Sequence, residues 1–476
     1  MPTTGETSRS VDRKARMKIA FEDLPLRAPQ DRIGDFESVY LPLDAAFAMK
    51  VAERCIQCPE APCRDACPMH NDIPAAMWLM EQGDFIGAAK VYRQTSSLPE
   101  ICGLVCPHDV VCQGSCVRNK KGEPVLTGAL EAFACAYARE REGVEISVGS
   151  PTGKRIAIVG SGPSGLSCAE QLASSGHAVT VFESSPAPGG LLVYGIPNFK
   201  LLKNVVFARI DDLRRAGVSF VNNTRIGKDK SIDDLFADGF HAVFIGVGSL
   251  IDAPMDAPGV DLQGVYQATD FLVRANVATD LLPPDKRSRP YVGRKVVVIG
   301  GGDTASDCLR SALRLGADQV TCLYRRTEAE MPGNKKDRQL ARDEGALYRF
   351  LTQPVRFIAG PDGRLSAVEC LQCELGEPDQ SGRRRPVPIE GSNFIVNADT
   401  AILALGYWPD PLIGDTTPGL NTHKYGLVIA DTETGATSRP GVYAGGDAVT
   451  GPDLVVTAMR AGRKAAAAIH AYLEGK

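Results

Sequence analysis

No run of apolar residues in this sequence is long enough to span a bilayer, and the N-terminal stretch MPTTGETSRSVDRKARMK lacks the apolar core of a secretory signal. Positive charge is not in excess either. The net charge is -4, which gives no reason to expect a basic face for nucleic acid. Glycine and proline are spread along the chain rather than gathered in a disordered tract. We therefore expect a cytoplasmic protein that binds neither a membrane nor nucleic acid.

The sequence does contain a concentration of cysteine. Of its 14 cysteines, eight lie between Cys55 and Cys116. Because disulfides are disfavoured in a reducing compartment, such a group in a cytosolic chain indicates metal ligation. The two runs are Cys55-x2-Cys58-x4-Cys63-x3-Cys67-Pro68 and Cys102-x3-Cys106-Pro107-x4-Cys112-x3-Cys116.

Short cysteine spacings followed by Cys-Pro favour iron–sulfur clusters, since several thiolates must converge on iron and proline turns the chain away. Zinc is the main alternative, although only the first pair has the CxxC form of a zinc ribbon. Buried structural cysteine is the other alternative, and it is common for single residues rather than for eight. Cys370 and Cys373 fall in an alternating pattern and are predicted to be strand cysteines.

A glycine-rich turn follows the apolar strand at 156–159. Gly160, Gly162 and Gly165 form GxGxxG, in which the glycines allow a tight turn, close approach of a pyrophosphate and packing of helix on strand. Glu183 ends the next strand, where a carboxylate can accept hydrogen bonds from a ribose diol. The strand, the helix and the acidic strand end together predict a dinucleotide-binding unit.

A second unit has the form GxGxxA, with Gly300, Gly302 and Ala305. Its next strand ends in Arg325 and Arg326 and carries no acid. Two guanidinium groups at this place favour a 2′-phosphate, so the unit should prefer NADP(H) to NAD(H). The alternative is a solvated basic turn.

Two such units in one chain suit a reductase that binds FAD in the first and NADPH in the second. The run GVYAGGDA (441–448) supports the flavin half, because a strand that ends in Gly-Gly-Asp can aim Asp447 at a sugar-alcohol hydroxyl. The helix expected from Leu454 to Leu473 would point the positive end of its dipole at the flavin.

These patterns predict an α/β protein with a helical double-cluster domain and two Rossmann-like domains in a glutathione-reductase-like arrangement. An irregular charged arm, residues 1 to about 40, precedes helical patterns at 43–50, 75–80 and 85–92. A flexible linker follows at 148–154. The expected domains are 1–145 for the clusters, 150–285 with 405–476 for FAD, and 286–404 for NADPH.

The whole chain from about Glu53 resembles the small (beta) subunit of bacterial NADPH-dependent glutamate synthase. It is also similar to the N-terminal half of dihydropyrimidine dehydrogenase and to the large subunit of the NADH-dependent ferredoxin:NADP oxidoreductases. The motifs are LPEICGLVCP (98–107), GGLLVYGIPNFKL (189–201), VVVIGGGDTASDC (296–308), YRRTEAEMPG (324–333), GEPDQSGRRR (376–385) and GGDAVTGPDLVVTAMRAGRKAA (445–466). The last three are closest to glutamate synthase.

The resemblance implies the ligands of two 4Fe–4S clusters. The first set is Cys55, Cys58, Cys63 and Cys116, and the second is Cys67, Cys106, Cys112 and Glu131, while Cys102 matches a cysteine that is not a ligand. Cys135 lies close to Glu131 in the sequence and is the competing fourth ligand of the second set. The matching motifs add Pro163, Ser164, Gly190, Leu191, Lys200, Gly446 and Thr457 to the FAD site, and Asp303 and Thr304 to the NADPH site.

The function implied is electron input. NADPH would reduce FAD, and the clusters would pass electrons to the large (alpha) subunit, where glutamine and 2-oxoglutarate become glutamate. One alternative is an NAD(P)H-oxidising subunit for another acceptor, such as a ferredoxin or a dihydropyrimidine dehydrogenase partner. Another is a redox-sensing or assembly module without turnover, although such a module would not need an NADPH site.

Overall fold

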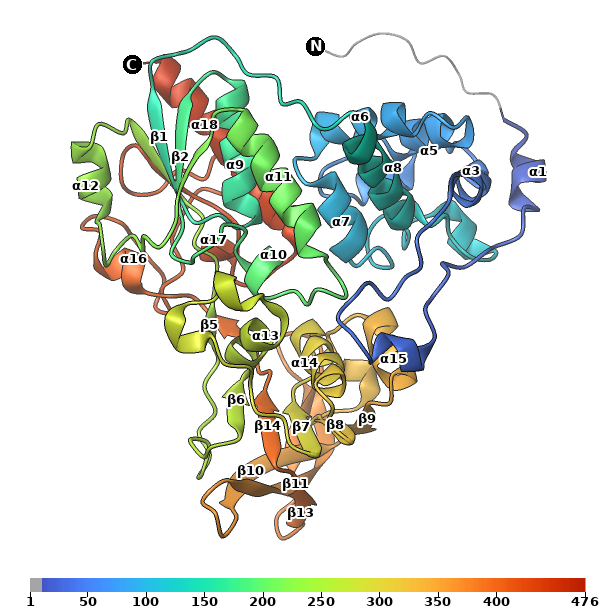
Figure 1. Cartoon of the computed structure of the whole chain (residues 1–476), viewed down its shortest axis with the longest axis vertical. Helices are drawn as coiled ribbons and strands as arrows, with labels where there is room; N and C mark the ends of the chain where they lie inside the picture. The colour runs from blue at the N-terminus through green and yellow to red at the C-terminus, as the bar shows by residue number, and fades with distance from the viewer. Residues whose placement is uncertain (1–10, 476) are drawn as a thin grey trace.

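The cysteine region folds as helices in the computed structural model, which describes residues 11–475 (Figure 1). Asp44, Asp72 and Asp84 cap three of these helices by accepting hydrogen bonds from backbone N–H groups in the first turn. These are the helices predicted near 43–50, 75–80 and 85–92. The region contains α3 (Ala45–Glu53), α4 (Pro62–Asp65), α5 (Ile73–Glu81), α6 (Phe85–Thr95), α7 (Pro99–Val105), η1 (Val117–Lys120) and α8 (Thr127–Arg141). We call residues 41–147 the cluster region.

A first parallel sheet follows, with strand order β16-β4-β1-β2-β3. The chain forms β1 to β4 in succession, leaves this sheet for the second unit, and returns near the C-terminus to add β16. Helices α9, α11 and α18 pack on it (Figure 1). We call this the first unit. Its elements are β1 (Arg155–Val159), α9 (Pro163–Ser174), β2 (Ala178–Phe182), α10 (Leu191–Tyr194), α11 (Lys203–Arg215), β3 (Ser219–Val221), α12 (Ile232–Ala237), β4 (Ala242–Ile245), α16 (Leu412–Asp415), β16 (Val442–Ala444), α17 (Asp447–Thr450) and α18 (Val455–Glu474).

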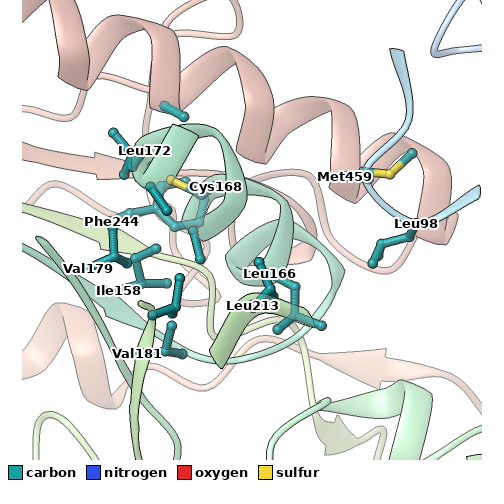
Figure 2. Packing of buried hydrophobic residues seen from close by; sticks show 14 of the residues in the cluster. Leu98, Ile158, Leu166, Cys168, Leu172, Val179, Val181, Leu213, Phe244 and Met459 are labelled. Atoms are coloured by element: carbon teal, nitrogen blue, oxygen red, sulfur yellow. The ribbon is translucent and has the colours of Figure 1, made fainter. Parts of the chain in front are cut away.

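The core of the first unit extends into the cluster region. Leu98 lies beside Met459 of α18, while Ile158, Leu172 and Phe244 fill the space between sheet and helices (Figure 2). α9 and α18 can pack closely because Gly462 of α18 has no Cβ. A Cβ at this position would come within 2.1 Å of a backbone oxygen of α9. The two regions therefore share one hydrophobic core.

A second parallel sheet has the order β6-β14-β7-β8-β9 and carries an antiparallel extension. We call this the second unit. It comprises β6 (Val265–Gln267), α13 (Ala268–Asn276), η2 (Thr279–Leu281), η3 (Pro284–Lys286), β7 (Lys295–Ile299), α14 (Asp303–Arg314), β8 (Gln319–Leu323), η4 (Glu328–Glu330), α15 (Lys335–Asp343), β9 (Leu347–Arg349), β10 (Thr352–Ala359), β11 (Leu365–Pro378), β12 (Arg384–Pro388), β13 (Phe394–Asn397) and β14 (Thr400–Leu403). Cys370 and Cys373 are buried in β11, as strand cysteines.

The topology differs in one respect from the boundaries expected at residues 285 and 286. β6 pairs with β14, so β6 and the α13 helix that follows it lie with the second unit although both precede residue 286. The two units are connected by the short antiparallel pair β5 (Ile251–Asp252) and β15 (Tyr407–Trp408).

The expected irregular arm and flexible linker are both held in place. The arm contains α1 (Arg13–Met17) and α2 (Pro29–Arg32), and it runs from the cluster region to α15 and back (Figure 1). Its first ten residues lie outside the described part of the chain. In the linker, Thr152 donates its N–H to the carbonyl of Gly176 at 3.0 Å. Short-range patterns miss such contacts because the partners are distant in sequence.

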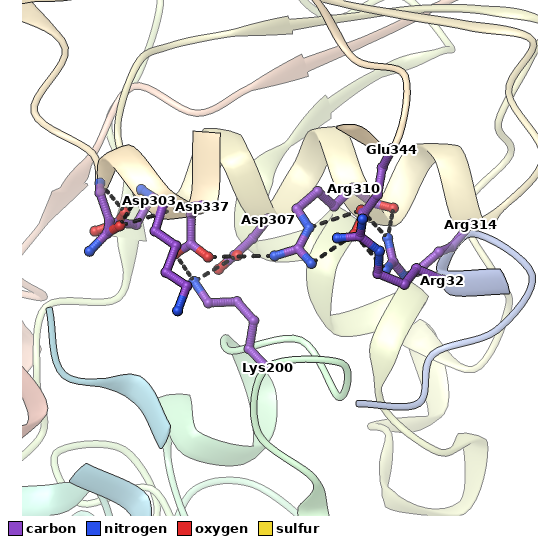
Figure 3. A network of polar contacts seen from close by, with 10 residues as sticks. Arg32, Lys200, Asp303, Asp307, Arg310, Arg314, Asp337 and Glu344 are labelled. Carbon is purple, nitrogen blue, oxygen red and sulfur yellow. Dashed lines mark hydrogen bonds and ion pairs between the residues drawn. The ribbon is translucent and has the colours of Figure 1, made fainter. Parts of the chain in front are cut away.

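A buried ion cluster joins the arm to the second unit (Figure 3). The Glu344 carboxylate accepts hydrogen bonds from Arg310 Nε at 2.9 Å and Arg314 Nη1 at 2.7 Å, and lies 3.6 Å from Arg32 Nη1 of α2. The guanidinium groups of Arg310 and Arg314 lie over the ring of Phe199, which belongs to the first unit. Although burial opposes it, hydrogen bonds from both arginines keep the pKa of Glu344 below its usual range.

Replacing Glu344 with Gln should destabilise the protein, because three buried guanidinium groups would lose their carboxylate. Removing one partner of a buried ion pair costs about 3–5 kcal/mol. The midpoint of thermal unfolding should therefore fall by roughly 3–5 °C in a calorimetric scan, because a chain of this length loses about 1 °C per kcal/mol. Glu390→Gln, at an exposed position, is the matched control and should leave the midpoint unchanged. A Glu344→Gln protein as stable as the wild type would show that the ion cluster does not hold these parts together.

Candidate functional site

One cavity of about 2610 Å³ runs between the cluster region and the two units. It is lined by the glycine turn of each unit, by Asp447, and by Cys106 of the cluster region. A cofactor in either unit would therefore open onto the same space. The predicted residues that line it are Gly160, Gly162, Pro163, Ser164, Glu183, Gly190, Leu191, Lys200, Asp447, Gly300, Gly302, Asp303, Thr304, Arg325 and Arg326.

The first glycine turn has the geometry that pyrophosphate binding requires. Gly160 has a φ of +99°, and a Cβ there would lie 2.5 Å from the carbonyl oxygen of Gly246. A Cβ at Gly165 would lie 2.0 Å from the carbonyl oxygen of Gly160, so only glycine lets α9 approach β1. Gly162 faces open space at the N-terminus of α9, where the backbone N–H groups and the helix dipole favour an anion.

Glu183 is buried behind this turn and is held by protein donors. Its carboxylate accepts hydrogen bonds from Ser161 N at 3.2 Å and Ser185 N at 2.7 Å, and also from the hydroxyls of Ser161 and Ser184. The carboxylate is therefore fixed at the cavity wall. The sequence pattern predicts Glu183 but not Ser161, whose hydroxyl also accepts a hydrogen bond from Gly189 N at 2.8 Å. No motif signals this second contact.

Asp447 begins α17 after Gly446, which has a φ of +69° and lies against Ser164 of the first glycine turn. Burial raises the pKa of the Asp447 carboxyl to about 7. A carboxyl that is part protonated at neutral pH can both donate and accept a hydrogen bond, which suits a sugar hydroxyl.

Two residues predicted at the FAD site are occupied by other contacts. Lys200 Nζ lies 2.8 Å from Asp337 Oδ2 and 3.0 Å from Asp307 Oδ1, both in the second unit (Figure 3). Thr457 donates its hydroxyl to the carbonyl of Leu454 within α18 and is not among the residues that line the cavity. Lys200 thus bridges the two units, a role that a motif within one unit cannot signal.

Lys203 is a further residue that the sequence analysis missed. Its ammonium donates to the carbonyl of Leu192, in α10, at 2.9 Å, and to the carbonyl of Ile196, in the turn that follows α10. Burial lowers the pKa of Lys203 to about 7. The lysine fixes the turn that carries Gly190 and Leu191 into the cavity.

The second glycine turn repeats the geometry of the first. Gly300 has a φ of +146°, and a Cβ there would lie 2.1 Å from the carbonyl oxygen of Ala404. Gly302 faces open space at the N-terminus of α14, and Ala305 is buried against the sheet. The Asp303 carboxylate accepts a hydrogen bond from Asn334 N at 2.7 Å, and the Thr304 hydroxyl lies 3.3 Å from that of Tyr407.

The structure separates the two arginines that the sequence analysis treats as equivalent. Arg325 is exposed at the cavity, and the described residues give it no hydrogen bond or ion pair. Arg326 is buried, and it donates to Asp379 Oδ2 at 2.8 Å and to the carbonyl of Arg384 at 2.7 Å. Arg326 therefore supports the β11–β12 hairpin.

The eight expected cluster ligands belong to two sets, and within each set the charges of some members raise the pKa of others. Burial raises the pKa of Cys55 and of Cys63 to about 12, and the neighbouring thiols of Cys58 and Cys116 add to both rises. A buried thiol without a nearby cation resists ionisation, and bound iron supplies that positive charge. This donor set fits an iron–sulfur cluster.

The second group contains Cys67, Cys106, Cys112 and Glu131. Burial raises the pKa of Cys67 and of Cys112, and Glu131 and Cys106 add to each rise. Asn71 Nδ2 donates to Glu131 Oε1 at 3.1 Å and itself accepts a hydrogen bond from Thr95. The charge of Glu131 adds to the raised pKa of Cys67 and of Cys112. Its role as the fourth ligand stays a prediction.

Backbone conformation also marks the cysteine loops. Gln57, Ala61 and His70 all have positive φ angles, between 41° and 52°, although none is glycine. Such conformations cost energy and persist where the surroundings fix them.

Among residues 11–475 no group of three or more His, Cys, Asp or Glu side chains is placed to hold one metal ion.

The second group lies against the first unit. Cys67, Cys106 and Val105 pack on the core that contains β1 and α18. Cys55, Cys63 and Cys116 pack only on the helical core of the cluster region. Cys67 and Cys106 of the second group therefore border the first unit, while Cys112 of that group is buried in the helical core.

Two family models match the chain. The model described as dihydropyrimidine dehydrogenase domain II, 4Fe-4S cluster, matches residues 32–143, and that of the pyridine nucleotide-disulphide oxidoreductases matches residues 154–462. Within residues 11–475 the structure has no helix long and apolar enough to cross a membrane. The structure of Mycobacterium tuberculosis FprA in complex with NADPH superimposes with a TM-score of 0.57 at 22% identity, over 68% of this chain and 85% of that one. The predicted fold class is confirmed.

Two relatives from Escherichia coli (strain K12) match nearly the whole sequence. AegA, which is named as an oxidoreductase without an established activity in that name, is 41% identical over 463 residues, 94% of this chain and 70% of that protein. The NADPH glutamate synthase small chain is 40% identical over 464 residues, 95% of this chain and 97% of that protein. The chain, which joins a 4Fe–4S domain to a pyridine-nucleotide oxidoreductase domain, therefore belongs to the glutamate synthase small-subunit family.

Proposed function

We propose that this chain is the NADPH-oxidising, electron-input subunit of a glutamate synthase. Family membership makes it an NAD(P)H-dependent flavin oxidoreductase with an iron–sulfur domain. The observation that carries the electron-input role is one cavity onto which both glycine turns, Asp447 and Cys106 open. Cofactors that exchange electrons must lie close together, and this cavity allows it.

The residues of the chain assign a place to each cofactor. The turn at 160–165, with Glu183 and Asp447, would hold FAD, and the turn at 300–305, with Arg325, would hold NADPH. The two cysteine groups would each hold a 4Fe–4S cluster. When bound, these groups supply hydride transfer from NADPH to FAD and single-electron transfer to a partner. The chain's own residues orient the rings and exclude water.

The proposed partner is the large (alpha) subunit, on which glutamine and 2-oxoglutarate would be converted to glutamate. The 97% coverage of the Escherichia coli small chain supports this assignment. A second candidate is electron supply to a different acceptor, because AegA matches the chain equally well and its name gives no glutamate synthase role.

With the glutamate synthase large subunit from the same cells, the purified protein should support glutamate formation from glutamine and 2-oxoglutarate. NADPH should exceed NADH in kcat/KM by about tenfold or more, because a charge-assisted hydrogen bond to the 2′-phosphate is worth roughly 1.5–3 kcal/mol. NADPH–dye reduction without glutamate formation would favour the second candidate. Absence of dye reduction would contradict any role as a reductase.

Loss of a ligand of the second group should separate two activities. Cys67→Ala should leave NADPH–dye reduction largely intact, since a dye can reach the flavin directly, and should abolish glutamate formation. Cys102→Ala, which removes a buried thiol next to Cys106 outside the proposed ligand set, is the matched control and should retain both activities. Circular dichroism must first show that each variant is folded. Full glutamate synthesis by a folded Cys67→Ala protein would mean that this group serves the fold alone.

Asp447→Asn should stabilise the flavin-free protein in a pH-dependent way. The pKa of the carboxyl is near 3.9 when unfolded and about 7 when folded. Between these values the folded wild type binds more protons, so its stability falls as pH rises, by up to about 1.4 kcal/mol per pH unit. The advantage of the variant in thermal unfolding should grow from about pH 4 to about pH 7 and then level off.

The matched control for this pH series is Asp415→Asn, at an exposed position of α16. It should run parallel to the wild type at every pH. Parallel curves for Asp447→Asn as well would show that the Asp447 carboxyl is not held at a raised pKa.

A further inference from the structure

The β11–β12 hairpin reaches the cavity and contacts Arg326 just beyond the end of β8, and its tip has a defined shape. Asp379 Oδ1 accepts a hydrogen bond from Ser381 N at 2.8 Å, and Asp379 N donates to the carbonyl of Arg383 at 2.8 Å. Gly382, with a φ of +77°, closes the turn. The tip therefore presents Arg383 in a fixed backbone position, where its side chain lines the cavity.

Arg326 joins this hairpin to the end of β8. Its guanidinium donates to Asp379 Oδ2 at 2.8 Å and to the carbonyl of Arg384 at 2.7 Å, and only 6% of the residue is exposed. The carboxylate of Asp379 already balances the charge of Arg326. A bound anion would therefore find little unused capacity on Arg326.

Arg325 and Arg383, unlike Arg326, have N–H donors that are free to bind an anion. Both line the cavity, and the described residues give Arg325 no partner. Arg383 donates only through Nε, to the hydroxyl of Ser381 at 2.9 Å, which leaves both terminal nitrogens unused. Two guanidinium groups that face one space can grip a phosphate dianion through paired N–H donors.

We propose that Arg383 and Arg325 form the subsite for the 2′-phosphate of NADPH, with Arg326 and Asp379 as positioning residues that hold the hairpin in place. The inference rests on the proposed function, since it assumes an NADP(H) donor. The end of β8 is where a ribose lies in a unit of this topology, while the pyrophosphate belongs at the N-terminus of α14. A 2′-phosphate is the anion expected at this position.

The test is calorimetric titration of the holoenzyme with NADP⁺ and with NAD⁺. Arg383→Gln should weaken NADP⁺ binding about tenfold or more and leave NAD⁺ binding unchanged, because only NADP⁺ carries the 2′-phosphate. Arg385→Gln removes the same charge from an exposed position two residues further on, outside the cavity lining, and should change neither affinity.

A pH series adds a readout that a purely structural role would not move. The second pKa of a phosphate monoester is about 6, so NADP⁺ binding to the wild type should weaken below that pH. Arg383→Gln should flatten this dependence, and Asp379→Asn should weaken NADP⁺ binding selectively through displacement of the hairpin.

The outcomes separate the two proposals. A wild type that binds NAD⁺ as tightly as NADP⁺ would overturn the proposed donor. If the wild type prefers NADP⁺ but the Arg383→Gln protein has unchanged affinities for both nucleotides, the Arg383 subsite alone would be overturned. Equal losses for both nucleotides would make Arg383 a residue of the fold and would also overturn the subsite. The expected result is a selective loss of NADP⁺ in Arg383→Gln with Arg385→Gln unaffected.

Discussion

A buried charge must find a partner, and Glu344 finds three, from parts of the chain that are far apart in sequence. Arg310 and Arg314 come from α14 and Arg32 from the N-terminal arm, while Phe199 of the first unit covers two of the guanidinium groups. None of these charges can be buried alone without a large cost in solvation. The arm and the two units must therefore come together, and their junction forms one wall of the cavity.

The junction has a second contact of the same kind. Lys200 extends from the first unit to Asp307 and Asp337 of the second, and although burial opposes it, these carboxylates raise the pKa of the lysine. Cys106 of the cluster region borders the core of the first unit and also opens onto the cavity. Ion pairs thus hold the two units together, and apolar packing holds the cluster region against the first unit, around the cavity that the proposed cofactor sites share.

The features that the sequence predicted well are those with local causes. The glycine turns follow from steric limits within a few residues, and the capped helices of the cluster region follow from their own first turns. The features that it missed depend on distant partners. Lys200 matches a motif of the first unit but bonds to the second, and Arg326 looks like Arg325 until Asp379 is placed beside it. The cofactor assignments and individual ligands stay predictions.

The N-terminal arm shows why a polar sequence without periodicity can still be a built part of a fold. Arg16 donates to the carbonyl of Cys55 at 2.8 Å and pairs with Glu81, and Arg13 donates to the carbonyls of Ile56 and Gln57. These carbonyls belong to the first cysteine loop, where Gln57 has a positive φ and its neighbours lack regular partners. Farther along the same arm, Arg32 reaches Glu344. The arginines of the arm form hydrogen bonds and ion pairs with backbone and side-chain partners. The arm is therefore held in place although it has no apolar stripe. One segment thereby links the first cysteine loop to the second unit, and the position of the expected metal ligands in that loop depends on the same kind of long-range charge pairing that shapes the cavity.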